Sequence, residues 1–589
     1  MVSGVVTRSI LLLLALAANA AVVSSWQSKV DSRVLQNAAH KKTEFLVFLA
    51  EQADVSGAAA LKLKHEKGAH VHQRLTETAH RTQAPILKLL KARHLEHRPF
   101  WIVNMIWVRG TQADLQLLSQ RSDVLRIVAN PSIHFQEPLL APAPATVNAP
   151  ASVEWNIAHV HAPDLWALGY TGQGVVVGGQ DTGYQWDHPA LINHYRGWDG
   201  TNADHNYNWH DAIHGLDPHN SGDNPCGYDS PVPCDDHGHG THTMGTMVGD
   251  DGAGNQIGMA PGAKWIGCRN MERGWGNPAS YAECFQWFLA PTDLSGQNTN
   301  TAMAPDVINN SWYCPAEEGC IDPFIYTNIV QRLHDAGIVV VVSAGNNGYA
   351  GCSSVTMPAL YETSFAVGAT DSGDNIAGFS SRGPITADGS NRIKPNISAP
   401  GVNIRSSVPY NSYVGGWSGT SMAGPHVVGL VALLISAHPE LRGQVDTIER
   451  LIEQTAVPLT TTSNCDIPGT TVPNNTYGWG RIDAYAALGL QDSDGDGMSD
   501  YQEVLAGTNP RDPSSLLRIT DIHPTGSDFN ISFTTVSNKH YTLEYNADLT
   551  STNWTSVTNN LTGTGDLLQI TDPGAAATTQ RFYRIRLTP

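Results

Sequence analysis

Ser421 stands in a turn of small residues, 419–426, directly before an apolar run, 427–435, that has the length of a helix. A serine that attacks a carbonyl must lie at the head of a helix, with neighbours small enough for a substrate backbone to approach. Ser421 is therefore a candidate nucleophile. Because Gly-x-Ser turns are common in loops, the assignment depends on partners elsewhere in the chain.

Two upstream segments supply the partners that a serine nucleophile needs, a base to take its proton and a carboxylate to orient the base. His239 lies in a glycine-rich stretch, 235–245, and Asp181 follows a strand-like apolar run, 175–180. Alone, Asp181 would be interpreted as a turn former or helix cap. Together the three residues predict a catalytic triad.

The three segments, in the order Asp, His, Ser, resemble those of subtilisin-like serine peptidases of the S8 family. The stretch 268–274 is most similar to the bacillopeptidase F branch, and the resemblance covers roughly residues 150–490. It implies that Asp181 orients the base, His239 is the general base and Ser421 is the nucleophile. Asn346 follows an apolar strand, 338–342, and matches the side-chain donor of the oxyanion hole.

The same resemblance implies two walls for the primary substrate pocket. The family commonly has glycine where this chain has Tyr313, so a narrower pocket is expected and the cleavage preference stays open. Pairing of an edge strand with substrate backbone does not require that glycine. The candidate substrate-binding residues are Ser311, Trp312, Tyr313, Ser343, Ala344 and Gly345.

A zinc cluster is the alternative interpretation of the histidine-rich segment, because imidazole and thiolate are common zinc ligands. It would use His237, His239, His242 and Cys234. The segment is rich in glycine and lacks the His-Glu-x-x-His signature of a metallopeptidase. His242 also has its own match, as a structural histidine of the family motif.

The first 150 residues differ in charge from the rest, with 17 Lys and Arg against 10 Asp and Glu, whereas residues 151–589 have 18 against 44. Residues 1–20 have the pattern of a signal peptide. Apolar runs at 44–49 and 100–108 predict strands with a helix between them, followed by a helix at 111–121 and a strand at 124–128. The basic segment 21–140 resembles the family's inhibitor-type prodomain, which serves as intramolecular chaperone and inhibitor. An independent accessory domain is the alternative.

Residues 141–153 are predicted to be a processing linker, because their prolines remove backbone donors and favour extended chain. We expect self-cleavage near 140–153 and a mature chain starting close to Glu154. The catalytic domain then spans 154–490. No later stretch reaches about 18 uninterrupted apolar residues, so the mature protein is expected to be soluble.

All eight cysteines fall within the predicted catalytic domain. An even number in an exported chain indicates disulfides. Short separations make Cys226 with Cys234, and Cys314 with Cys320, reasonable local pairs, although eight cysteines allow 105 pairings. Free buried thiols are the alternative for some of them.

Residues 491–515 contain a predicted calcium loop that begins at Asp492. Its acidic residues match an EF-hand at positions 1, 3, 5, 9 and 12, with glycine at position 6 and a backbone carbonyl at position 7. No second loop is visible, so we expect Ca²⁺ to rigidify a connector rather than to regulate. An acidic solvated linker is the alternative. The predicted ligands are Asp492, Asp494, Asp496, Met498, Asp500 and Glu503.

Residues 516–589 alternate polar and apolar residues between turns, which indicates a small antiparallel β domain. One hypothesis for the role of this domain is contact with the cell surface. The central domain is expected to be a doubly wound α/β fold with a mostly parallel sheet. The predicted function is a secreted or cell-surface serine endopeptidase, made as a self-processing zymogen, that acts on proteins or peptides as a monomer without a nucleic-acid partner. A catalytically idle surface-binding protein and a metallohydrolase are the alternatives.

Overall fold

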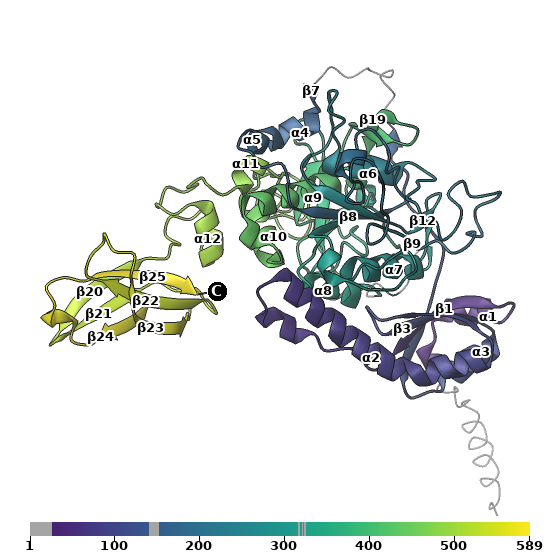
Figure 1. Ribbon diagram of the computed structural model, residues 1–589, viewed down its shortest axis with the longest axis horizontal. Helices are drawn as coiled ribbons and strands as arrows, with labels where there is room; N and C mark the ends of the chain where they lie inside the picture. The colour runs from purple at the N-terminus through teal and green to yellow at the C-terminus, as the bar shows by residue number, and fades with distance from the viewer. Residues whose placement is uncertain (1–25, 141–151, 316–317, 321, 323–324, 589) are drawn as a thin grey trace, which may run out of the picture.

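The structure is a computed structural model that describes residues 26–140, 152–315, 318–320, 322 and 325–588 (Figure 1). The predicted signal peptide, 1–20, and most of the predicted processing linker, 141–153, lie outside the described residues. The described residues form three parts: an N-terminal α+β unit, a central α/β unit and a C-terminal β unit.

The central unit is built on a seven-stranded sheet in which every neighbouring pair is parallel. Its order is β17-β16-β15-β14-β8-β11-β9. The first strand of the sheet along the chain is β8, and the following strands are added first on one side of it and then on the other. Such a switch point opens a crevice at the carboxyl ends of the strands. The strands are β8 (Val176–Asp181), β9 (Trp209–Asp211), β11 (Lys264–Arg269), β14 (Val307–Asn310), β15 (Val339–Ser343), β16 (Phe365–Thr370) and β17 (Ile397–Pro400).

Helices cover both faces of this sheet, which explains why its strands are apolar along their whole length. In β15, Val339 and Val341 join one core with helices α6 (His239–Val248), α9 (Thr420–Ala437) and α10 (Val445–Gln454). Val340 and Val342 join the other core with α7 (Pro278–Leu289) and α8 (Thr327–Asp335). Among the described residues, α9 alone is long and apolar enough to cross a bilayer, but 89% of it is buried inside the protein.

The N-terminal unit is a four-stranded antiparallel sheet, in the order β2-β3-β1-β4, with helices on one face. Its elements are α1 (Ser32–Ala38), β1 (Thr43–Leu49), α2 (Lys64–Ala92), β2 (Glu96–Phe100), β3 (Met105–Gly110), α3 (Gln112–Ser119) and β4 (Val124–Ala129). The predicted single strand at 100–108 is wrong, because residues 101–104 form a turn between β2 and β3. Asn104 in that turn is buried and hydrogen-bonds to Glu51, Gln52, Thr82 and Gln83.

The open face of this N-terminal sheet packs on α7 and α8 of the central unit, below them in Figure 1. Phe48 of β1 and Met105 of β3 belong to the same apolar cluster as Phe285 of α7 and Leu333 of α8. The two units therefore share one hydrophobic core. Short strands extend the contact: β5 (Ile133–His134) joins β13 (Trp275–Gly276), and β6 (Leu139–Leu140) joins β19 (Ser412–Ser418).

The C-terminal unit comprises two three-stranded antiparallel sheets, in agreement with the predicted β domain. Helix α12 (Asp500–Ala506) precedes it and lies close to α10 in Figure 1. Val504 of this helix is buried in the core of the central unit. The strands are β20 (Ile519–Thr525), β21 (Asp528–Phe533), β22 (His540–Asn546), β23 (Thr555–Thr562), β24 (Leu568–Asp572) and β25 (Phe582–Thr588).

The remaining elements are short and lie around the central sheet. They are β7 (Ser152–Val153), α4 (Trp155–His159), α5 (Ala162–Ala167), β10 (Asn255–Gln256), β12 (Met271–Glu272), β18 (Ile404–Val408) and α11 (Ala484–Ala487). Four disulfides join the eight cysteines, and they include both predicted local pairs. The pairs are Cys226–Cys234, Cys268–Cys284, Cys314–Cys320 and Cys352–Cys465.

Candidate active site

Asp181, His239 and Ser421 come from three elements that meet at the carboxyl edge of the sheet. Asp181 ends β8, His239 begins α6 and Ser421 is the second residue of α9. The Nδ1 atom of His239 lies 2.7 and 2.9 Å from the two carboxylate oxygens of Asp181. Both side chains are almost completely buried. This hydrogen bond orients the imidazole and leaves its Nε2 atom for a nucleophile.

The ring of Phe135 lies 4.7 Å from the ring of His239, the predicted base. Nε2 of His239 is buried and has no hydrogen-bond partner among the described residues. Ser421 Oγ instead donates to the Ser311 carbonyl at 3.4 Å. Catalytic hydrogen bonds are often long before a reaction and shorten in the reacting complex.

Asn346 is held so that its amide nitrogen can serve the oxyanion. Its Oδ1 accepts hydrogen bonds from the backbone N–H of Thr420 at 2.9 Å and from the Thr420 hydroxyl at 2.8 Å. With the oxygen occupied at the first residue of α9, Nδ2 becomes the donor that remains for a ligand. The amino end of α9 adds a positive dipole at the same place.

Asp235 fixes the turn that precedes His239, the predicted base, and it was not among the predicted site residues. Its carboxylate accepts from the backbone N–H groups of His237, Gly238 and Thr241 at 3.0, 2.7 and 2.9 Å. It also accepts the hydroxyls of Thr182 and Thr241 at 2.9 and 2.6 Å. The carboxylate thus joins the turn before α6 to the residue that follows Asp181. The signal available in the sequence was an aspartate four residues before the candidate base.

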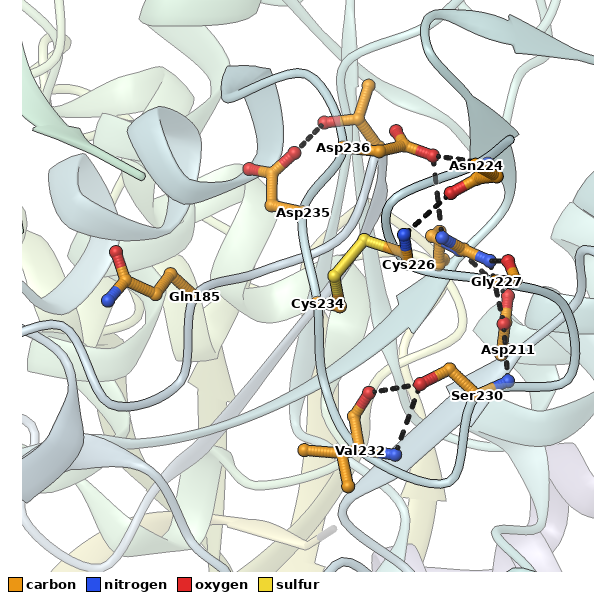
Figure 2. Close-up of a disulfide and its surroundings, with 12 residues drawn as sticks. Gln185, Asp211, Asn224, Cys226, Gly227, Ser230, Val232, Cys234, Asp235 and Asp236 are labelled. Carbon is orange, nitrogen blue, oxygen red and sulfur yellow. Dashed lines mark hydrogen bonds and ion pairs between the residues drawn. A yellow bond between two sulfur atoms is a disulfide. The ribbon is translucent and has the colours of Figure 1, made fainter. Parts of the chain in front are cut away.

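The segment that carries Asp235 leaves a disulfide loop closed by Cys226 and Cys234, as Figure 2 shows. The loop is anchored by Asp236, whose carboxylate accepts from Asn224 at 3.0 Å and lies 3.4 Å from the buried guanidinium of Arg269. Burial raises the pKa of Asp236 to about 6, although the Arg269 charge opposes the shift. A cavity of 630 Å³ opens beside this loop, next to His237.

The predicted pocket walls lie next to Ser421, with one exception. Ser311, Tyr313, Ser343 and Gly345 line a cavity together with Ser421 and Asn346. Trp312 also lines this cavity, while its ring is buried and stacks on Tyr281 at 3.9 Å. Ala344 is buried and its N–H donates to the Val367 carbonyl, so it supports the wall from behind.

The end of the N-terminal unit passes through this site, which the sequence analysis did not predict. Ile133 and His134 form an antiparallel ladder with Trp275 and Gly276 on one side. Leu139 and Leu140 pair with Ser418 and Trp417 on the other. Between these ladders, Gln136 lines the cavity next to Ser421. No local pattern marks this stretch, because all of its partners are distant in sequence.

The predicted calcium loop gathers carboxylates around a point. Among the described residues, Asp492, Asp494 and Asp496 form the one cluster whose possible ligand atoms all lie within 4.8 Å of one another. Asp494 Oδ2, Asp496 Oδ2 and Glu503 Oε2 are buried without a hydrogen-bond partner. Burial, together with Asp494 and Asp496, raises the pKa of Glu503 to about 7. Unpaired carboxylate oxygens in this arrangement fit a hard divalent cation.

Two other predicted calcium ligands, Asp500 and Met498, form hydrogen bonds within the loop. The carboxylate of Asp500 accepts from the N–H and the hydroxyl of Ser493 at 2.9 and 2.7 Å, so it braces the loop from one side. The backbone N–H of Met498 donates to Asp496 at 2.8 Å. The predicted ligand at Met498 is its carbonyl oxygen, and that oxygen takes no part in these hydrogen bonds.

Comparisons with known proteins agree with this geometry. A model of the subtilase family matches residues 172–480, which is more than half of the chain. Bacillopeptidase F of Bacillus subtilis (strain 168) is 36% identical over 572 residues, covering 91% of this chain and 37% of that protein. Subtilisin Savinase of Lederbergia lenta is 30% identical over 337 residues, covering 57% of this chain and 98% of that protein. The chain belongs to the subtilase family.

The predicted resemblance to subtilisin-like serine peptidases is therefore confirmed, as is the α/β fold with its C-terminal β domain. This subtilase spans 37% of the length of bacillopeptidase F and 62% of the length of subtilisin E of Bacillus subtilis (strain 168). A model of the bacterial TSP3 repeat matches residues 492–513, the segment with the calcium-loop pattern.

The zinc interpretation of the histidine-rich segment does not survive in this subtilase. Cys234 forms a disulfide and has no thiolate to offer. His239 is bonded to Asp181, and the ring of His242 is buried and stacks on Trp417 at 4.5 Å. Burial lowers the pKa of His242 to about 3, so the ring stays neutral and serves as packing.

Proposed function

We propose that this subtilase is a secreted serine endopeptidase, made as a zymogen that processes itself and then hydrolyses protein substrates. The observation that supports the proposal best is the extended segment 133–140. It has a strand ladder at each end, and between the ladders Gln136 lines the cavity that contains Ser421 and Asn346, which supports binding of an extended substrate there. An edge strand that pairs with an extended peptide binds backbone and tolerates many sequences.

The proposed reaction gives each of these groups a defined role. Ser421 Oγ attacks the carbonyl carbon of the substrate while His239 Nε2 takes the hydroxyl proton, and Asp181 stabilises the imidazolium. Asn346 Nδ2 and the backbone N–H of Ser421 donate to the oxyanion. His239 then gives its proton to the leaving amine, and water hydrolyses the acyl-enzyme by the same steps in reverse order.

Labelling tests the proposal against a catalytically idle binding protein. The processed protein is treated with a fluorophosphonate, and its peptides are analysed by mass spectrometry. We expect one adduct, on Ser421, together with hydrolysis of casein by the same processed protein. An unlabelled Ser421 in a folded, processed protein would support the idle scaffold instead.

The zymogen organisation is also part of the proposal. Residues 1–20 would direct export, 21–140 would act as chaperone and inhibitor, and the linker 141–153 would be removed to leave a mature start near Glu154. The apolar core shared between the N-terminal unit and helices α7 and α8 supports a chaperone role, because it offers a folding surface. Cell-surface contact through residues 516–589 and a monomeric state stay predictions.

We further propose that the loop at 492–503 binds Ca²⁺. Asp492, Asp494, Asp496 and Glu503 would hold the ion, which would supply charge neutralisation to four clustered carboxylates. The ion would fix α12, because Glu503 lies on this helix. Tyr501 of the same helix stacks on His438 at 4.1 Å and donates to Glu440 at 2.6 Å, so the loop is joined to the catalytic unit.

Calorimetry on full-length Ser421→Ala protein tests the calcium proposal without self-digestion. We expect one binding isotherm and a rise of a few degrees in melting temperature at saturating Ca²⁺, since a ligand at 100 times its Kd adds about 2.7 kcal/mol. Asp494→Ala should abolish both effects, whereas Asp566→Ala, an exposed change in the C-terminal β unit, should keep them. An absent isotherm in the parent protein would refute the site.

A further inference from the structure

The segment that crosses the active site shows which peptide bond faces the nucleophile. The ladder of β5 with β13 ends at His134, and the ladder of β6 with β19 begins at Leu139. Only residues 135–138 lie between them. The chain therefore enters and leaves the cleft at fixed points, and the bond opposite Ser421 belongs to this short stretch.

Three contacts narrow the choice to one bond. The ring of Phe135 lies 4.7 Å from the ring of His239, on the side where the chain enters. Gln136 lines the cavity formed by Ser421, Asn346 and Thr420. The backbone N–H of Phe135 still donates to the Gly274 carbonyl at 2.9 Å, and the carboxylate of Glu137 lies 3.1 Å from Nε2 of His237. Because Gln136 alone of residues 135–138 lines the cavity with Ser421 and Asn346, its carbonyl is the best candidate for attack.

The side chain of Gln136 makes a specific contact in the pocket. Its Nε2 donates to Asn347 Oδ1 at 2.9 Å. Asn347 is itself fixed, because its backbone N–H donates to Ser381 Oγ at 3.0 Å. Asn347 follows the oxyanion residue Asn346 directly, so one loop holds both the group that stabilises the transition state and the group that contacts the substrate side chain.

We propose that Gln136–Glu137 is the first bond this protein cuts in its own chain, and that Asn347 selects substrates with a glutamine on the amino side of the cleaved bond. The inference rests on the proposed function and makes it more specific. A later cut in 141–153 would trim residues 137 onward from the new amino terminus. Tyr313 lines the same cavity as Gln136, in the position where the family commonly has glycine.

The first cut balances without any co-reactant except water. Ser421 Oγ bonds to the Gln136 carbonyl carbon and loses its proton to His239. The bond from that carbon to the Glu137 nitrogen breaks, and His239 returns the proton to this nitrogen, which becomes the new amino terminus. Water then hydrolyses the ester, and Gln136 leaves with a free carboxylate while Ser421 recovers its proton.

A carboxamide in the pocket suits glutamine for a physical reason. Asn347 offers an acceptor and a donor, and the glutamine side chain offers their complements. An apolar side chain in the same position leaves the Asn347 carboxamide without a partner, and a site built for hydrogen bonding discriminates against a ligand that cannot form them. For a half-buried neutral pair we expect discrimination of about tenfold.

Sequencing of the cut products tests the first half of the inference. Full-length protein is purified from a protease-deficient host, and its fragments are followed by mass spectrometry from the earliest time of processing. We expect a fragment ending at Gln136 and a partner starting at Glu137 before any shorter catalytic chain appears. A first new terminus within 140–153, with no earlier one at Glu137, would overturn this assignment.

Peptide cleavage by the processed enzyme tests the second half. The substrates are Ile-His-Phe-X-Glu-Pro peptides in which X is Gln, Leu, Ala or Lys, and rates are normalised to Ser421 labelled by fluorophosphonate. We expect kcat/KM for Gln to exceed that for Leu about tenfold. Asn347→Leu should abolish this ratio, and Asn347→Asp should keep Gln and raise Lys, because a carboxylate accepts from both.

Tyr349→Phe is the matched control, since Tyr349 is exposed on the same loop, and it should leave the ratio unchanged. A preference for Leu in the parent enzyme, or the same Gln to Leu ratio in Asn347→Leu, would overturn the role of Asn347. Either result would leave the proposed function standing, because labelled Ser421 and cleaved peptides would still be seen. Failure to label Ser421 at all would count against the proposed function itself.

Discussion

The proposed oxyanion role of Asn346 is favoured by the fact that its side-chain oxygen is already occupied. Both hydrogen bonds from Thr420 end on Oδ1, and Thr420 is the first residue of the helix that carries Ser421. The amide therefore cannot flip without losing two bonds. The donor and the nucleophile are fixed to one another through a single residue, which keeps the site arranged before the substrate arrives.

Replacing Asn346 by alanine tests this at the residue scale. We expect kcat to fall by about 100- to 1000-fold, equivalent to about 2.7–4 kcal/mol, because the donor acts on the charge of the transition state. KM should change little, since ground-state binding uses other groups. Steady-state kinetics with a peptide substrate would show it. A loss in KM alone would mean that Asn346 binds substrate rather than the oxyanion.

At the scale of elements, helix α9 carries Ser421 because its glycines allow close packing against its neighbours. A Cβ atom at Gly429 would lie 2.2 Å from Met259 Cβ and 3.1 Å from the Met247 carbonyl. The first contact is far below any allowed distance. The glycine in the apolar run of the sequence therefore permits close packing against neighbouring segments, and a larger residue would displace the helix that positions the nucleophile.

Gly429→Ala should accordingly destabilise the protein despite the higher helix propensity of alanine. We expect a loss of about 1–3 kcal/mol from overpacking, measured by denaturant unfolding of the Ser421→Ala protein. Gly415→Ala in β19, where the nearest atom lies 3.6 Å from the added Cβ, is the matched control and should be nearly neutral. Equal stability of the two variants would refute the packing argument.

The segment in the cleft is held partly by an ion pair between Glu137 and His237, which makes its hold depend on pH. The hydrogen bond from His237 lowers the pKa of the Glu137 carboxyl. Burial lowers the pKa of His237, but Glu137, Asp235 and Asp181 together raise it above its ordinary 6.5. The pair is therefore complete between the lowered pKa of Glu137 and about pH 6.5, and it is lost as pH rises through the raised pKa of His237.

We expect the segment 136–140 of uncut Ser421→Ala protein to be more protected from hydrogen exchange at pH 6 than at pH 8. Protection factors, which correct for intrinsic exchange rates, are the quantity to compare. Glu137→Gln should remove most of the difference, because the pair then has no charge on one side. Unchanged protection across this range in the parent protein would show that the ladders alone hold the segment.

At the scale of the whole molecule, the N-terminal unit contacts the central sheet at both ends. The segment 133–140 occupies the carboxyl end, beside Ser421. At the amino end, Lys64 of α2 donates to Asp306 at 2.7 Å and to the Ala304 carbonyl at 2.8 Å. Asp306 in turn accepts from the N–H of Val176, the first residue of β8, at 3.1 Å.

Lys64→Met should therefore shorten the time between the first cut and the appearance of peptidase activity. After that cut, only non-covalent contacts hold the N-terminal unit on the central unit. Removing one member of a buried pair costs up to 3–5 kcal/mol, but Arg442, 3.4 Å away, still neutralises Asp306. We expect activity to appear about 10- to 100-fold faster after cutting. Lys88→Met, an exposed change on the same helix, should have no effect, and equal rates for both variants would contradict the prediction.

The family and the fold could be predicted from the sequence because each has local signatures of residue types at short spacing, whereas the roles of the triad and of the calcium loop stay predictions. The sequence did not predict contacts between distant segments. Gln136 and Asn347 are 211 residues apart, and Lys64 and Asp306 are 242 apart. The predicted strand at 100–108 failed for a related reason, since an apolar run cannot show that the buried Asn104 makes a turn within it.

The most direct test of the account compares processing of the wild-type protein and Ser421→Ala in a host that lacks other extracellular proteases. Intact-mass spectrometry follows the chain with time. We expect wild-type protein to separate into an N-terminal fragment and a catalytic chain, while Ser421→Ala accumulates folded and uncut. Maturation of Ser421→Ala at the wild-type rate would contradict this expectation, because the bond would then be cut by something other than Ser421.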